Sequence, residues 1–302
     1  MSNSRIFAHL QLTRPANVVT AIADIMAGFA IAGMGAYLTG FSNEGGYLAD
    51  LCWLALSTIG LYAGGVAFND VFDADLDSVE RPERPIPSGR ATVKSASIMA
   101  FLLLLMGVVA AAQVTVTSAI IALTVAVLAV LYDYWGKHQN FLGPINMGLC
   151  RTFNLLLGIS VIPELVQEYA FIGLIPLVFV AAITMISRGE VHGKNRKALF
   201  GGLAMYILIV ASIVTLAFML GGKPLEVLPF LLLFVYMVFP PLIKAIKKQE
   251  PKLIGKAVKA AVISLIILNA SLSAAFAGWM YALLVLILLP ISLWLARKFA
   301  VT

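Results

Sequence analysis

The chain has 302 residues, of which 61% are hydrophobic and 12% are charged. Soluble globular proteins contain about 45–50% apolar and about 25% charged residues, so this composition excludes an ordinary soluble domain. The formal net charge is +6. In so apolar a chain we attribute the excess charge to Lys and Arg beside a membrane, and we expect no nucleic-acid partner.

Long apolar stretches recur along the chain, each long enough to cross a hydrocarbon core of about 30 Å. They lack the alternation typical of β-barrel strands. We therefore predict an all-α, polytopic transmembrane bundle of nine or ten spans, in one domain over residues 1–302. In the nine-span alternative, the last two stretches form one span and an interfacial helix. The predicted spans are 16–38, 47–69, 92–112, 114–134, 141–162, 167–187, 197–220, 225–244, 256–276 and 279–296.

Lys and Arg alternate between the connections of these spans. The N-terminus and the even-numbered connections are rich in them, whereas the odd-numbered connections are nearly bare. Because basic loops stay on the cytoplasmic side of a cell membrane, we expect the N-terminus and the even connections to be cytoplasmic. The motif loops described next all belong to that set.

The stretch 69–90 follows the second predicted span and holds six of the 15 acidic residues. Asn69, Asp70, Asp73 and Asp77 stand at i, i+1, i+4 and i+8, so on a continuous helix the carboxylates share one face. Like charges so close repel one another, and a bound cation relieves the repulsion. Carboxylates together with phosphate oxygens suit Mg²⁺. The alternative is a solvated acidic cap at the end of the span.

Arginines follow the carboxylates in the segment 81–90, whose prolines restrict the backbone. Guanidinium groups bind phosphate oxygens in pairs, so Arg81 and Arg84 are candidate ligands of a phosphorylated substrate, while Arg90 is equally well explained as a membrane anchor. A second polar cluster follows the sixth span and has one acid, Glu190, among several cations. It suits a diphosphate better than a second full metal site. His192 there is either a general base or simply solvated.

Polar residues also lie within or beside the predicted spans. Arg151 stands inside the fifth span, and a charge within a span is costly unless it faces a cavity or a partner. We treat Arg151 as a functional candidate, and Asp24 in the first span as a weaker one. Tyr132 is either a site residue or a member of an interfacial aromatic belt.

These residues resemble the motifs of the UbiA superfamily of intramembrane prenyltransferases. The segment N-D-x-x-D-x-x-x-D at 69–77, followed by R-P-x-R-P-I-P-S-G at 81–89, is similar to that family's first signature. R-P-x-N at 14–17 resembles the start of its first helix, and Tyr132, Lys137 and the segment 143–151 resemble its fourth and fifth helices. The match is spread over most of the chain.

The resemblance implies a helical bundle around a central cavity, covered by a cytoplasmic cap, in which Mg²⁺ holds a prenyl diphosphate while a lipophilic acceptor is alkylated. It implies that Asp70, Asp73 and Asp77 ligate Mg²⁺ with help from Asn69. Together with Glu190 and Lys194 of the second cluster, this gives the expected catalytic residues Asp70, Asp73, Asp77, Glu190 and Lys194. The expected metal ligands are Asp70, Asp73, Asp77 and Glu190. The expected substrate-binding residues are Asn17, Asn69, Arg81, Arg84, Tyr132, Lys137, Asn146, Arg151, Arg188 and His192.

The second motif departs from the family pattern. The family usually has D-x-x-x-D after the sixth helix, whereas the match here is Glu190 to Lys194. A protonated lysine cannot ligate Mg²⁺, but it neutralises diphosphate directly. The variant S-R-G-E-V-H-G at 187–193 resembles the EboC-like group of the superfamily.

Two functions are consistent with these observations. The first is an enzyme that transfers a prenyl group within the bilayer. The second is a transporter, or a protein that binds lipids or prenyl diphosphates without turnover. Transporters place charges and broken helices near the middle of the membrane, whereas most charges here lie at one face. This distribution favours the prenyltransferase.

Overall fold

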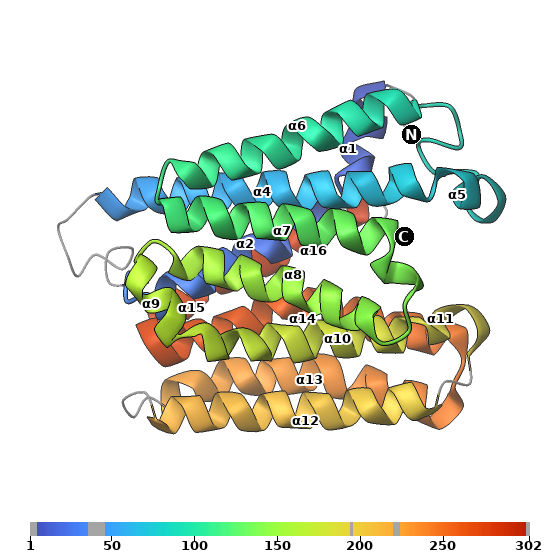
Figure 1. Cartoon of the computed structure of the whole chain (residues 1–302). Helices are drawn as coiled ribbons and strands as arrows, with labels where there is room; N and C mark the ends of the chain where they lie inside the picture. Colours follow the sequence, from blue (N-terminus) through green and yellow to red (C-terminus); the bar gives the residue numbers. More distant parts are fainter. Residues whose placement is uncertain (1–4, 36–45, 194–195, 220–223, 300–302) are drawn as a thin grey trace.

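A computed structural model describes residues 5–35, 46–193, 196–219 and 224–299, and over these ranges the chain is built of helices joined by turns (Figure 1). This confirms the predicted all-α class. The helices are α1 (Arg5–Leu12), α2 (Pro15–Ile31), α4 (Gly46–Phe72), α5 (Ala74–Glu80), α6 (Val93–Ala112), α7 (Val116–Tyr134), η1 (Gly136–His138), α8 (Leu142–Ile159), α9 (Pro163–Glu168), η2 (Ala170–Gly173), α10 (Leu174–Ser187), α11 (Gly189–His192), α12 (Arg196–Met219), α13 (Pro224–Lys248), α14 (Pro251–Ala277), α15 (Trp279–Leu286) and α16 (Leu288–Lys298).

Each of the ten predicted spans coincides with a helix or a helix pair. Among the described residues, eight helical segments are long and apolar enough to cross a membrane. The two that fall short of this measure are α2, which has 17 residues, and α8, which carries Asn146, Arg151 and Asn154. The polar residues of α8 and the shortness of α2 are tolerated because both helices are largely buried inside the protein.

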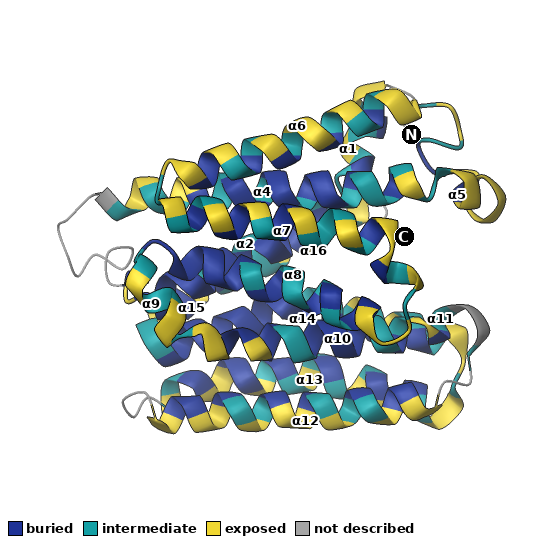
Figure 2. Cartoon of the chain, viewed as in Figure 1, coloured by how far each residue is buried: buried dark blue, intermediate teal, exposed yellow. Residues whose placement is uncertain are grey.

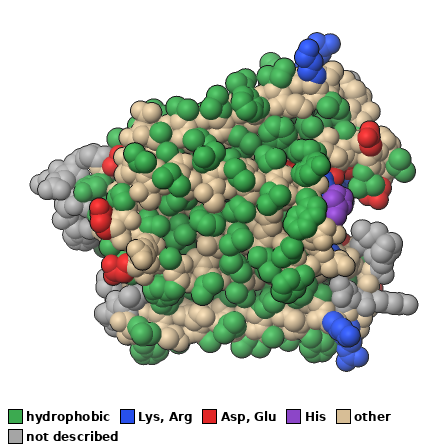
Figure 3. Space-filling view, viewed as in Figure 1, with side chains coloured by type: hydrophobic (Ala, Val, Ile, Leu, Met, Phe, Trp, Pro, Cys, Tyr) green, Lys and Arg blue, Asp and Glu red, His purple; other side chains and the backbone are tan. Residues whose placement is uncertain are grey.

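The bundle has a buried centre and two flanks. Helices α2, α8 and α14 form the centre, with α4, α6 and α7 on one flank and α10, α12 and α13 on the other (Figures 1 and 2). In α14, 72% of an apolar stretch of 18 residues is buried, whereas in the last segment, Trp279–Lys298, only 22% of such a stretch is buried. The flanking helices expose large apolar side chains such as Phe101, Ile120 and Leu232. Figure 3 shows hydrophobic side chains spread over the visible face of the bundle and charged ones near its two ends, as expected of a surface in contact with lipid.

Glycines allow the central helices to approach closely. A Cβ atom on Gly28 of α2 would lie 2.3 Å from the carbonyl oxygen of Leu155 in α8, and one on Gly158 would lie 2.4 Å from that of Ile25. A Cβ on Gly60 of α4 would likewise meet the backbone of α6 at 2.5 Å. Small residues at such crossings let two backbones pack directly, as is common in membranes.

The predicted motif loops meet at one end of the bundle. Figure 1 shows α1, α5, η1 and α11 at this end, and α9 and α15 at the opposite end. We call the first the motif end. The chain thus brings together segments that are separated by more than a hundred residues, and the cavity described next opens among them.

Candidate functional site

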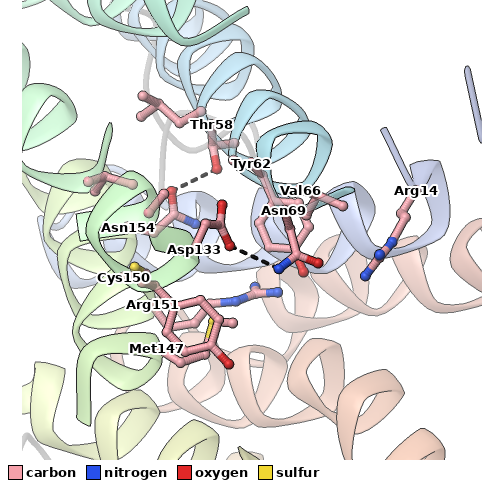
Figure 4. Close-up of a pocket in the computed structure, with 15 residues that line it drawn as sticks. Arg14, Thr58, Tyr62, Val66, Asn69, Asp133, Met147, Cys150, Arg151 and Asn154 are labelled. Atoms are coloured by element: carbon pink, nitrogen blue, oxygen red, sulfur yellow. Dashed lines mark hydrogen bonds between the residues drawn. The ribbon is translucent and has the colours of Figure 1, made fainter. Parts of the chain in front are cut away.

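A cavity of about 270 Å³ lies between α4, α7 and α8, with Arg14 contributing from the start of α2 (Figure 4). Polar residues, among them Asn69, Asp133 and Tyr132, stand toward the motif end of their helices. The wall between and beyond them is formed mainly by apolar and aromatic side chains. The lining residues are Arg14, Thr58, Leu61, Tyr62, Gly65, Val66, Asn69, Val125, Ala129, Tyr132, Asp133, Met147, Cys150, Arg151 and Asn154.

The acidic stretch lies where α4 gives way to α5. Helix α4 ends at Phe72, and Asp73 has φ −93° and ψ 5°, outside regular helical geometry. The backbone hydrogen bonds nevertheless continue, because the N–H of Asp73 donates to the oxygen of Asn69 and that of Asp77 donates to the oxygen of Asp73. The carboxylates therefore keep the one-turn spacing that the sequence predicts, across a local kink rather than on one straight helix.

Each of these carboxylates is paired with a cation. Asp70 accepts from Arg14 at 2.7 Å and from Arg84 at 3.3 Å, and Arg84 also donates to Asp77 at 2.6 Å. Asp73 pairs with Lys137, which follows α7. Asp70, Asp77 and Arg84 are buried, so their charges are compensated within the protein. Over the described ranges, no three Asp, Glu, His or Cys residues converge as ready metal ligands.

The arginines after the acidic stretch have different surroundings. Arg81 is exposed at the motif end, whereas Arg84 is buried in the pairs just described. Arg90 donates to Gln11 at 2.8 Å and to the backbone oxygen of Glu83 at 2.7 Å. It therefore fastens the loop to α1. Of the arginines in this loop, Arg81 is the one whose charge is presented to solvent.

The second cluster is described in part. Glu190 of α11 is half-buried, and burial raises the pKa of its carboxyl above the usual 4.5, while Arg81 and Lys259 act in the opposite direction. Arg188 donates to the backbone oxygens of Gln139 at 2.6 Å and Asn140 at 2.8 Å, so it anchors the loop after η1. Lys194 lies outside the described residues, and His192 is described only as the last residue of α11.

Arg151 lines the cavity and is held by a buried polar network. It donates to Asp24 at 2.8 Å and to Thr20 at 2.8 Å, and its guanidinium lies 4.8 Å from the centre of the Tyr62 ring. Asp24 also accepts from Asn154 of α8 and from Asn269 of α14. One carboxylate thus joins all three central helices beneath the cavity. The predicted placement of Arg151 at a cavity agrees with this structure.

Other predicted residues are not among those that line the cavity. Asn17 is half-buried on α2, Asn146 is buried on α8, and Lys137 is engaged with Asp73. Conversely, Asp133, Thr58 and Asn154 line the cavity although sequence reasoning did not single them out. The signal that marks them is polarity within an apolar run, which is costly in a membrane unless the side chain faces a partner or a cavity.

The sequence of this chain is similar to a known protein family and to individual relatives. A model of the UbiA prenyltransferase family matches residues 26–257. Digeranylgeranylglyceryl phosphate synthase of Ignicoccus hospitalis is 29% identical over 193 residues, covering 64% of this chain and 60% of the relative. The enzyme of the same name from Methanopyrus kandleri is 35% identical over 155 residues, covering 50% of this chain and 53% of the relative. This chain thus spans less than two thirds of both relatives.

Solved structures share the fold. A digeranylgeranylglyceryl phosphate synthase superposes with a TM-score of 0.66 at 19% identity, over 90% of this chain and 99% of that one. A UbiA homolog from Archaeoglobus fulgidus bound to DMAPP and Mg²⁺ has a TM-score of 0.64 at 14% identity, over 92% and 98%. The two curated relatives are digeranylgeranylglyceryl phosphate synthases, so the expected placement in the EboC-like group finds no support in them. Since the family model matches most of its length, the chain belongs to the UbiA prenyltransferase family.

Proposed function

We propose that this chain is a Mg²⁺-dependent prenyltransferase that moves a prenyl group from a prenyl diphosphate to a lipid acceptor within the membrane. The main observation behind the proposal is that a mainly apolar cavity lies next to the charged motif end. An allylic diphosphate has this same division, because its head is charged and its tail is apolar. We also propose that residues 1–302 act as one domain with the motif end in the cytoplasm.

The acidic stretch fits Mg²⁺ in its chemistry. Asp70, Asp73 and Asp77 offer hard oxygen ligands one helical turn apart, and the Archaeoglobus homolog binds Mg²⁺ together with DMAPP. In this structure Arg84 forms ion pairs with Asp70 and Asp77, and Lys137 forms one with Asp73. We infer that a metal ion takes over that role when substrate is present. When bound, it supplies neutralising charge to the leaving diphosphate.

The residues around the carboxylates would complete the site. Arg14, Arg84 and Lys137, once released from their pairs, lie close enough to the acidic stretch to bind diphosphate oxygens. Arg81 adds a solvent-facing cation. The rings of Tyr62 and Tyr132 line the cavity, and aromatic faces stabilise a cationic allyl group while apolar walls exclude water.

The relatives suggest the acceptor class. Their name specifies a glyceryl phosphate that carries two geranylgeranyl groups. By analogy we propose a glyceryl phosphate lipid with a free hydroxyl as acceptor here, and geranylgeranyl diphosphate as donor. An ether bond then forms between the hydroxyl oxygen and the allylic carbon.

Metal-dependent binding tests this proposal. Purified protein in detergent is titrated with geranylgeranyl diphosphate in Mg²⁺ and in EDTA. We expect binding in Mg²⁺ that is lost in EDTA and weakened at least about tenfold by Asp73→Ala, since this change removes a metal ligand. Asp75→Ala is the matched control, because Asp75 is an exposed carboxylate two residues further along, on α5. Binding that is as tight in EDTA as in Mg²⁺, or that Asp73→Ala leaves unchanged, would argue against a metal-dependent site.

A further inference from the structure

Asp133 is a buried carboxylate on the wall of the cavity, and nothing in the proposed diphosphate site uses it. It precedes the last residue of α7 and is 4% exposed. The side-chain amide of Asn69 donates to it at 3.0 Å across the cavity (Figure 4). Tyr132, its neighbour in the chain, lines the same cavity. The carboxylate therefore stands between the acidic stretch and the apolar chamber.

Asp133 differs from the other buried acids in its partner. Asp24 is paired with Arg151, and Asp70 and Asp77 are paired with Arg84. Asp133 receives a hydrogen bond from a neutral amide, and in the described part of the chain it forms no ion pair. A carboxylate that is oriented by an amide, with no cation in direct contact, keeps lone pairs available to accept a proton.

We propose that Asp133 is the general base that deprotonates the acceptor hydroxyl. This rests on the proposed prenyl transfer. As the acceptor oxygen bonds to the allylic carbon, the carbon–oxygen bond to diphosphate breaks and diphosphate leaves with that electron pair. The hydroxyl proton passes to Asp133, and solvent water later removes it. No oxidant or other reactant is required.

The surroundings favour this role over a direct part in holding diphosphate. Because a carboxylate repels the anionic diphosphate, Asp133 cannot bind it directly as the cations Arg14 and Lys137 can. Protonation of Asp133 leaves a neutral acid in a mainly apolar cavity, and a neutral group costs less to bury than a charge. Asn69 fixes the orientation of the carboxylate and is in this sense a positioning residue.

The test uses full-length protein with Asp133→Asn, which keeps the shape of the side chain. Geranylgeranyl diphosphate, Mg²⁺ and geranylgeranylglyceryl phosphate are supplied, and the ether product is quantified. Loss of a general base lowers kcat by about 10²–10⁴-fold, while KM for both substrates and binding of geranylgeranyl diphosphate should stay within about threefold. Asp133→Glu should recover part of kcat, because it restores a carboxylate.

Asp50→Asn is the matched control, since Asp50 lies near the opposite end of α4 from Asn69. It should transfer at the wild-type rate. Wild-type transfer with an unchanged kcat in Asp133→Asn would overturn the role of Asp133 alone. Loss of geranylgeranyl diphosphate binding in Asp133→Asn, or failure of Asp133→Glu to recover any kcat, would also overturn it. No transfer by wild-type protein that binds geranylgeranyl diphosphate would overturn the proposed function as well.

Discussion

At the scale of single residues, most of the buried carboxylates that the structure describes are paired with an arginine, and Asp133 is the exception. Asp24 accepts hydrogen bonds from Arg151, Asn154 and Asn269, and it is 1% exposed. The sequence singles out Asp24 and Arg151 separately, because a charge in an apolar run is costly. It does not predict that they pair, since 127 positions separate them and the contact depends on how α2 and α8 cross.

Asp24→Asn should destabilise the protein by about 3–5 kcal/mol, because it leaves the buried Arg151 guanidinium without its counter-charge. Thermal unfolding in detergent measures the effect. Adding Arg151→Met to Asp24→Asn should recover part of the loss, since the double variant removes the uncompensated charge. Strictly additive losses in the two single variants and their combination would show that the pair is not coupled.

Glu190 should make stability depend on pH. Burial raises the pKa of this carboxyl above 4.5, so the folded protein holds the proton more tightly than the unfolded chain does. Protonated Glu190 therefore stabilises the folded protein fully at a pH below the ordinary glutamate pKa, and this stabilisation is lost as the pH rises through the raised pKa. Glu190→Gln should therefore make the free energy of unfolding depend less on pH between about pH 4 and pH 8. The exposed Glu83→Gln should not, and an equal change in both variants would contradict the assignment.

At the scale of elements, apolar length predicts most of the helices but not their interruptions. The ranges expected at 92–112 and 114–134 match Val93–Ala112 and Val116–Tyr134 within two residues. Within the expected span 16–38, α2 stops at Ile31 and Gly33 takes the left-handed φ of 80°, while residues 36–38 lie outside the described residues. The division of the last span at Ile287 falls inside an unbroken apolar run, so hydropathy carries no trace of it.

The crossing of α2 and α8 should be sensitive to one methyl group. Gly158→Ala places a Cβ 2.4 Å from the oxygen of Ile25 and 2.9 Å from the Cα of Gly28, so the helices must move apart. We expect a loss of about 1–3 kcal/mol in unfolding experiments. Gly255→Ala, on α14, meets no atom within 4 Å and should leave stability nearly unchanged. Equal effects of the two changes would mean that the close approach does not limit packing.

At the scale of the whole molecule, the alternation of basic loops predicts that the motif segments share one end, and the structure places α5, η1 and α11 together. The charge pattern also predicts which side of the membrane that end faces. Single cysteines tested with a membrane-impermeant maleimide measure the orientation. In a variant without Cys52 and Cys150, Glu83→Cys should react only from the cytoplasmic side and Glu164→Cys, on α9, only from the other. The reverse pattern would contradict the proposed orientation.

The lining of the cavity is harder to predict from the sequence than the motifs are. The family signature identifies Asn69 and the carboxylates beside it, and Arg151 stands out by its charge. Asp133, Thr58 and Asn154 join them only because α4, α7 and α8 pack around one space. Their role follows from three-dimensional proximity, which spacing along the chain does not encode.

The proposed function of the motif end and the cavity is to prenylate a lipid together. Its most direct test is mass spectrometry of the lipid formed from geranylgeranyl diphosphate and geranylgeranylglyceryl phosphate by the purified protein. We expect an acceptor enlarged by one geranylgeranyl group in Mg²⁺, and no such product in EDTA or with Asp73→Ala. Diphosphate released without any prenylated lipid, or product formed equally well in EDTA, would contradict it.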